Sequence, residues 1–161
     1  MKQLLLIRHA KSSWDMPLDD KSRPLINRGI KDSQAVFQEC MSFLPKKFTI
    51  WSSDSVRATQ TATIFADIIG VSVSDIHFKK ELYTFEMKKL EQIIKGCKDE
   101  IINLIIFGHN DAITDFVNKF GDVNVENVPT SGFVCLEFEG NEWATISKGK
   151  LKKILFPKDL K

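Results

Sequence analysis

Three short apolar runs most constrain how this chain of 161 residues can fold. They span residues 4–7, 48–51 and 101–107, and each is followed by polar residues and then by a helical pattern. Continuous apolarity over so few residues is typical of strands covered on both faces, as in the parallel sheets of α/β proteins. The pattern therefore predicts a three-layer α/β/α fold with a mostly parallel central sheet.

Helical periodicity predicts four helices around these strands. They are expected over residues 28–44, Val56–Ile69, residues 87–97 and residues 111–120. Pro45 is expected to end the first helix because proline cannot continue one, and Gly70 is the expected C-cap of the second.

The pattern changes near the C-terminus. Two apolar segments, Phe133–Phe138 and residues 143–147, flank the turn dipeptide Gly140-Asn141. They predict an antiparallel hairpin at the edge of a mixed sheet. The lysines of the tail that follows are expected on a solvated strand face, with a docking strip for an acidic phosphoprotein as the alternative.

Composition favours one soluble globular domain over residues 1–161, with 43% apolar and 27% charged residues. A net charge of +2 is too small to indicate a nucleic-acid partner, and no apolar run approaches the roughly 20 residues of a membrane span. Cys40, Cys97 and Cys135 are odd in number and far apart, which favours buried thiols over disulfides or a zinc site. These features predict a cytoplasmic protein with no nucleic-acid or membrane partner.

Side chains suited to anion chemistry follow all three apolar runs. Arg8 and His9 follow the first run, and Arg57 lies one helical turn beyond the second. His109 follows the third run, after Gly108. Ligands of open α/β sheets bind outside the carboxyl ends of the strands, so these side chains are expected to converge on one crevice.

This set of residues predicts phosphoryl transfer. The transferred group carries negative charge on three oxygens, which the guanidiniums of Arg8 and Arg57 are suited to bind. A neutral His9 imidazole is a nucleophile that can form a phosphoramidate, which water then cleaves. A protonated His109 would add a further donor. No metal or cofactor is expected.

The leaving group needs a proton, and Glu81 in "KKELYTF" is the candidate acid. The alternatives are three aspartates of the long segment without periodicity over residues 11–27, namely Asp15, Asp19 and Asp20. Ser12 and Arg23 in the same segment are candidates for substrate binding. A turn for Ser12, and a salt bridge from Arg23 to a loop aspartate, are the structural alternatives.

Five motifs, in this order and spacing, resemble those of the histidine phosphatase superfamily, and most of all its short SixA-type phosphohistidine phosphatase branch. They are "LIRHAKSSW", "RPLINRG", "WSSDSVRATQTA", "KELYTF" and "IFGHND", and the resemblance extends from Leu4 to about Phe138. It implies a phosphoglycerate mutase-like fold, a phosphohistidine intermediate on His9 and a phosphate pocket of Arg8, Arg57 and His109, without a metal. It also places Glu81 in the region of the family's acid.

Two departures from the family pattern bear on function. Ala10 stands where the superfamily often has glycine, and both residues are small. Asp15 stands where the phosphoglycerate mutase branch tends to carry a phosphate-binding asparagine, and a carboxylate there would repel a second phosphate. Mutase activity is therefore disfavoured.

The expected function is that of a metal-independent phosphatase acting on phosphohistidine of a protein. One alternative is a phosphomonoesterase acting on a small phosphate ester, such as a sugar or nucleotide phosphate. Another is a non-catalytic phosphoprotein-binding module, which the complete set of two arginines and two histidines disfavours.

Overall fold

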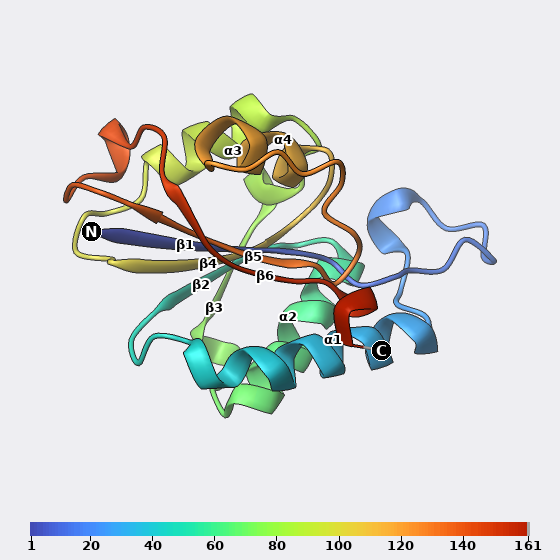
Figure 1. Cartoon of the computed structure of the whole chain (residues 1–161). Coiled ribbons are helices and arrows are strands. Elements are labelled where there is room, and N and C mark those ends of the chain that lie inside the picture. Colours follow the sequence, from blue (N-terminus) through green and yellow to red (C-terminus); the bar gives the residue numbers. More distant parts are fainter. Residues whose placement is uncertain (161) are drawn as a thin grey trace.

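Six strands form one mixed sheet between two layers of helices (Figure 1). The computed structural model describes residues 1–160, so Lys161, the last residue of the predicted domain, lies outside it. The strands are β1 (Lys2–Arg8), β2 (Thr49–Ser53), β3 (Ile76–Lys79), β4 (Asn103–Gly108), β5 (Phe133–Phe138) and β6 (Lys150–Leu155). Their order is β3-β2-β4-β1-β5-β6, with β1 to β4 parallel and β5 and β6 antiparallel to their neighbours. The predicted α/β class and mixed sheet are confirmed.

Two helices cover each face of the sheet (Figure 1). Helices α1 (Asn27–Cys40) and α2 (Val56–Ile69) lie on one face, and α3 (Met87–Lys95) and α4 (Ala112–Phe120) lie on the other. Helix α2 has the predicted bounds, because the Ser55 hydroxyl accepts from the Ala58 amide and Gly70 ends the helix at φ 81°. Helix α1 ends at Cys40, earlier than predicted, and a 3₁₀ turn over Met41–Phe43 carries the chain toward Pro45.

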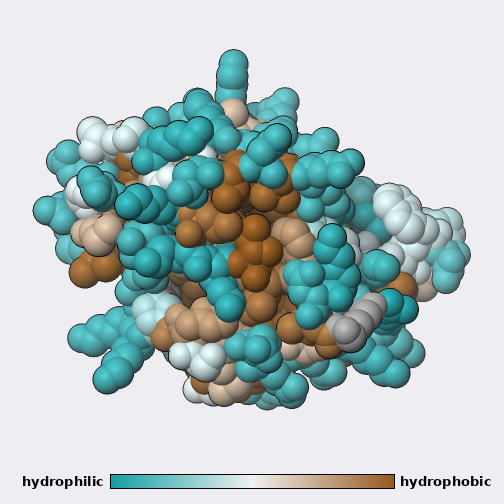
Figure 2. All heavy atoms as spheres, in the orientation of Figure 1, coloured by the Kyte–Doolittle hydropathy of each residue, from teal (hydrophilic) through white to brown (hydrophobic). Residues whose placement is uncertain are grey.

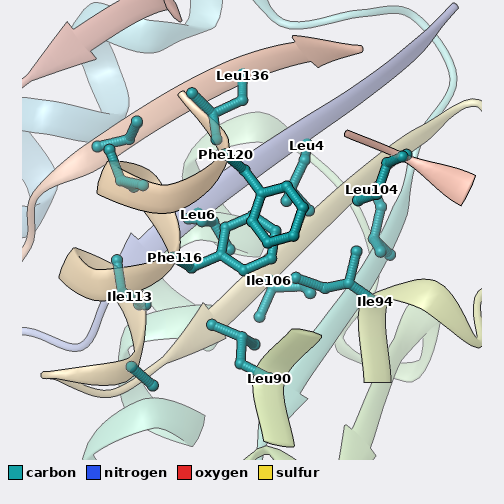
Figure 3. Packing of buried hydrophobic residues seen from close by; sticks show 14 of the residues in the cluster. Leu4, Leu6, Leu90, Ile94, Leu104, Ile106, Ile113, Phe116, Phe120 and Leu136 are labelled. Carbon is teal, nitrogen blue, oxygen red and sulfur yellow. The ribbon is translucent and has the colours of Figure 1, made fainter. Parts of the chain in front are cut away.

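Strand β1 supplies apolar side chains to both layers of the core. Leu4 and Leu6 pack toward α3 and α4, where they lie in one cluster with Phe116 (Figure 3). Leu5 and Ile7 belong to the cluster on the opposite face, beneath α1 and α2. Because alternate residues of a strand point to opposite faces, a strand buried on both sides requires an uninterrupted apolar run.

The predicted C-terminal hairpin forms, but its second strand is not the one expected. The strand is β6, and residues 143–147 instead begin with a 3₁₀ turn over Trp143–Thr145. Trp143 is fully buried, and its indole Nε1 donates to the Ile101 carbonyl at 2.7 Å. A buried indole needs such a partner. This hydrogen bond holds the segment outside the sheet, so the second strand of the hairpin begins only at Lys150.

Strand β6 forms one edge of the sheet and carries exposed lysines at positions 150, 152 and 153. The predicted solvated strand is thus confirmed. Lysines on an edge strand oppose pairing with other chains. Figure 2 shows apolar side chains gathered across the middle of the face on this side, with hydrophilic residues around them.

Two further sequence predictions concern thiols and membrane segments. Cys40, Cys97 and Cys135 are buried and free, as expected. Within residues 1–160, no helix is both long and apolar enough to cross a membrane.

Gly29 of α1 packs directly on the chain that leaves β1. A Cβ at this position would lie 2.4 Å from the Lys11 carbonyl oxygen, a distance that the backbone must relieve by moving. We expect Gly29→Ala to lower the free energy of unfolding by about 1–3 kcal/mol, as overpacking does, in urea denaturation. Gly96→Ala is the control, because its Cβ would make only ordinary contacts at 3.5 Å. Equal effects of the two substitutions would contradict this account.

Candidate active site

The register between β1 and β4 brings the two predicted histidines together. Arg8 pairs with Gly108 at the ends of these adjacent parallel strands, so His9 and His109 follow side by side. Their ring centroids lie 5.1 Å apart. The first turn of α2 brings Arg57 to both histidines, with hydrogen-bond contacts to the two rings. The predicted convergence of these strand ends is observed.

A cavity of about 470 Å³ opens beside His9. Four of the predicted site residues besides His9 line it, namely Arg8, Ser12, Arg23 and Arg57. His109 is only 1% exposed and lies behind this lining, against Arg57. The cavity therefore has a wall of cationic side chains with a histidine in it.

The hydrogen bonds of His9 define its tautomer. Nδ1 lies 2.8 Å from the Ala10 carbonyl oxygen, which can only accept, so Nδ1 carries the proton. Nε2 then holds a lone pair, which accepts from Arg57 Nε at 3.3 Å. Burial, together with the charges of Arg57 and Arg8, lowers the pKa of His9 to about 3. His9 is thus a neutral imidazole at pH 7, with Nε2 available as a nucleophile.

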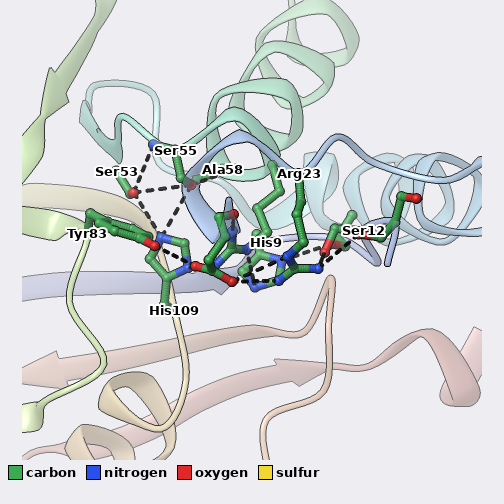
Figure 4. A network of polar contacts seen from close by, with 12 residues as sticks. His9, Ser12, Arg23, Ser53, Ser55, Ala58, Tyr83 and His109 are labelled. Atoms are coloured by element: carbon green, nitrogen blue, oxygen red, sulfur yellow. Dashed lines mark hydrogen bonds and ion pairs between the residues drawn. The ribbon is translucent and has the colours of Figure 1, made fainter. Parts of the chain in front are cut away.

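His109 is held in the opposite tautomer. Arg57 Nη2 can only donate, and it lies 3.4 Å from Nδ1, so the proton resides on Nε2. Nε2 donates to the Ser53 hydroxyl at 2.8 Å (Figure 4). Burial, together with His9 and Arg57, lowers the pKa of His109 to about 3. His109 is therefore neutral in the absence of phosphate, whereas a bound anion would raise its pKa.

Arg8 keeps a donor free for an anion. Its Nη1 donates to the Val128 carbonyl at 3.0 Å, while its Nε is buried without a hydrogen-bond partner. A buried unpaired donor is costly unless a ligand satisfies it. Burial lowers the pKa of the Arg8 guanidinium from its ordinary value, against the attraction of Asp111.

Asp20 is the carboxylate that the structure places in the cavity. It lies in a one-turn 3₁₀ helix (Asp20–Ser22), and its carboxylate accepts from Arg57, from Arg23 and from the Tyr83 hydroxyl. Burial acts to raise the pKa of Asp20, but the bonds from Tyr83, Arg57 and Arg23 outweigh it and hold that pKa well below its usual range. Asp20 is therefore ionised and accepts hydrogen bonds rather than giving a proton.

Arg23 both lines the cavity and forms the expected salt bridge to a loop aspartate, Asp20, at 3.0 Å. Its Nη1 also donates to the Ser12 hydroxyl at 2.6 Å. The ring of Trp14 lies 3.5 Å from the guanidinium carbon. Arg23 is thus held in one position although it lies in the long segment without periodicity.

The structure does not bring Glu81 to this cavity. Glu81 is exposed and lines a separate depression with Trp51 and Lys79. Asp15 and Asp19 are also exposed and do not line the cavity. The acid-bearing motif "KELYTF" instead contributes Tyr83, whose ring lies 5.3 Å from that of His109.

The sequence analysis assigned no role to two serines at and just beyond the end of β2. Ser53 ends β2 and Ser55 precedes α2, and both hydroxyls lie against Nε2 of His109. The signal available in the sequence was the position of these serines directly after the second apolar run. Tyr83 had no comparable signal, because its contact with Asp20 spans 63 residues of sequence.

The lowered histidine pKa values predict a pH-dependent stability. In the unfolded chain a histidine has a pKa near 6.5. Below that pH the unfolded chain therefore binds a proton at each of these histidines, whereas the folded protein does not. The stability that the neutral rings contribute is fully present above pH 6.5 and is lost as the pH falls toward 3. We expect the free energy of unfolding to fall by about 2 kcal/mol per histidine between pH 6.5 and 5, in urea denaturation. His9→Gln and His109→Gln should each reduce this loss, and variants that follow the wild-type pH dependence would contradict the expectation.

Comparison with known proteins agrees with this geometry. The profile of the histidine phosphatase superfamily (branch 1) matches residues 4–101. An uncharacterized chloroplastic protein of Arabidopsis thaliana is 29% identical in an alignment of 153 residues that covers 88% of this chain and 69% of that protein.

Two solved structures share the fold. The protein histidine phosphatase SixA, complexed with tungstate, superimposes with a TM-score of 0.83 at 17% identity over 99% of each chain. A mycobacterial glucosyl-3-phosphoglycerate phosphatase gives a TM-score of 0.69 at 11% identity, over 95% of this chain and 98% of that one. By its sequence profile and with this fold, the chain belongs to branch 1 of the histidine phosphatase superfamily.

Proposed function

We propose that this protein is a metal-independent phosphatase that forms a phosphohistidine on His9, and that its substrate is phosphohistidine on another protein. The observation that carries the proposal is the lone pair on His9 Nε2 beside a cavity lined by Arg8 and Arg57. A fixed nucleophile next to cationic donors is what transfer of a phosphoryl group requires.

The reaction has two steps. The phosphoryl oxygens bind Arg8 and Arg57, and the Arg57 Nε–H turns from His9 Nε2 to one of those oxygens, which frees the lone pair. Nε2 then attacks phosphorus, the bond from phosphorus to the substrate nitrogen breaks, and that nitrogen takes up a proton from water as it leaves. In the second step water cleaves the new bond to Nε2 and releases inorganic phosphate.

His109 has a supporting role in this scheme. It contacts Arg57 through Nδ1 and is fixed by Ser53 through Nε2. When phosphate binds, the approaching negative charge favours protonation of Nδ1. Once Arg57 Nη2 has turned from Nδ1 to the phosphoryl group, the protonated Nδ1 of His109 can donate to that group as charge develops on it.

The placement of the carboxyl groups favours a phosphoramidate over an alkyl ester as substrate. Glu81, the expected acid, lies outside the cavity, and Asp20 is held ionised. An alkoxide leaving group depends strongly on a general acid, whereas the leaving imidazole of phosphohistidine needs less assistance. Glu81 therefore takes no part in proton transfer in this scheme.

The opening of the cavity favours a protein as the partner. Trp14, Ile26 and Phe85 line it, and their exposed fractions are 76%, 36% and 47%. Exposed apolar side chains grouped at one site are typical of interaction surfaces. A small phosphate ester is the second candidate, in keeping with the fold shared with the glucosyl-3-phosphoglycerate phosphatase.

His9→Ala is expected to abolish turnover and the covalent intermediate, because no other group can supply the attacking lone pair. Wild-type protein incubated with a ³²P-labelled phosphohistidine protein should yield an acid-labile and base-stable phosphoenzyme. His77→Gln, which removes an exposed histidine outside the cavity, is the control and should keep both properties. Labelling that persists in His9→Ala would refute the assignment, and binding without any trapped intermediate would indicate a binding module.

Trp14→Ala is expected to raise the KM for a phosphohistidine protein about tenfold, since truncating an aromatic anchor of an interface costs roughly 2 kcal/mol. The KM for a small phosphate ester should rise by a smaller factor, because such a substrate loses only the support that Trp14 gives to Arg23. The measurement is a substrate panel run in the presence of EDTA, which also tests metal independence. Equal losses on both substrate types, or a preference of the wild type for small esters, would favour the phosphomonoesterase.

A further inference from the structure

Asp20 puts a negative charge where the phosphate-binding arginines point. Its Oδ2 lies 2.8 Å from Arg57 Nη2, and its Oδ1 lies 3.0 Å from Arg23 Nη2. Both guanidiniums are nearly buried, at 2% and 6% exposed, and all three residues line the same cavity. A carboxylate bridging two buried guanidiniums has the charge and the contacts of a bound oxyanion.

Most of the N–H donors of these two arginines already have partners within the protein, including His109 Nδ1 beside Arg57 Nη2. Arg57 donates from Nε to His9, from Nη1 to the Asp20 carbonyl and from Nη2 to the Asp20 carboxylate. Arg23 donates from Nε and Nη2 to Asp20, and from Nη1 to Ser12. Every nitrogen of both guanidiniums therefore has a partner within the protein, so a phosphate can engage them fully only if a partner leaves.

We propose that Asp20 is an internal anion that the substrate phosphate displaces from Arg57 and Arg23, and that it thereby sets the affinity of the cavity for phosphate. The inference rests on the proposed function, because it concerns the same cavity. Asp20 is the partner suited to leave: its side chain is 40% exposed, and its one-turn helix buries no side chain in the core.

Tyr83 holds the internal anion in place. Its hydroxyl donates to Asp20 Oδ2 at 2.5 Å, and its ring packs edge-on against His109 and Phe85. Removing the hydroxyl alone leaves the ring contacts and weakens the hold on the carboxylate. Weakening the hydrogen bond between Tyr83 and Asp20 should therefore increase the affinity for phosphate, as removing the Asp20 charge should.

Displacement has two consequences for the enzyme. A phosphate entering beside an ionised Asp20 meets a like charge, so only an anion that engages the arginines more strongly than the carboxylate does will bind. After hydrolysis, the return of the carboxylate to Arg57 and Arg23 favours release of inorganic phosphate. The arginines are kept neutralised and ordered between turnovers.

The alternative is that Asp20 positions Arg57 for phosphate, and the two roles predict opposite results. Inorganic phosphate is titrated by calorimetry into wild type, Asp20→Asn, Tyr83→Phe and Asp19→Asn. Internal competition predicts about tenfold or more tighter phosphate binding by Asp20→Asn, because a like charge is removed while an amide acceptor remains. Tyr83→Phe should shift binding in the same direction by a smaller factor. Asp19→Asn removes the same charge from an exposed neighbour and should stay within about twofold of wild type.

Phosphate binding by Asp20→Asn that is unchanged or weaker overturns the inference and assigns Asp20 to positioning. If Asp20→Asn fails to fold by circular dichroism, Tyr83→Phe decides, and the absence of tightening in that variant overturns it. Trapping of the phosphoenzyme on His9 is scored separately, so a wild type that is labelled while Asp20→Asn binds no tighter defeats only this inference. A wild type that neither binds phosphate nor becomes labelled defeats both proposals.

Discussion

The Arg57 guanidinium contacts both histidines of the site and the Asp20 carboxylate. It comes from the first turn of α2, a place where a cation is unfavourable next to the helix dipole unless anions compensate it. Asp20 supplies that compensation in the ligand-free protein, and a phosphate would supply it in the complex. Arg57 thus contributes to the orientation of His9, to the tautomer of His109 and to the position of the long loop.

Arg57 can occupy that position only because the sheet holds the histidines still. Strands β1 and β4 are buried on both faces, and their pairing of Arg8 with Gly108 fixes the two rings next to each other. The same burial keeps both rings neutral, since an imidazolium among arginines and apolar side chains would be poorly solvated. A rigid scaffold thus holds an imidazole that needs no base to deprotonate it near neutral pH.

The long segment between β1 and α1 shapes the cavity without regular structure. Arg23, Asp20 and Ser12 bond to one another within it, and Trp14 stacks on Arg23. The regular structure of this loop comprises the short 3₁₀ helix at Asp20 and an isolated bridge between Ser12 and Leu25. The side-chain contacts add to these in ordering the loop. The loop therefore forms one wall of the cavity, and its Trp14 and Ile26 form an apolar part of the rim.

The sequence by itself determined the layered fold and the meeting of Arg8, His9, Arg57 and His109 at one edge of the sheet, because runs such as Leu4–Ile7 report burial on both faces and parallel strands bring their carboxyl ends to one edge. Only the tertiary structure decided the rest. Trp143 leaves the sheet because its indole finds a partner at Ile101, and Asp20 rather than Glu81 reaches the cavity because the loop folds back onto Arg57 and Tyr83. These contacts join residues distant in sequence, and local pattern and propensity carry no information about such pairings.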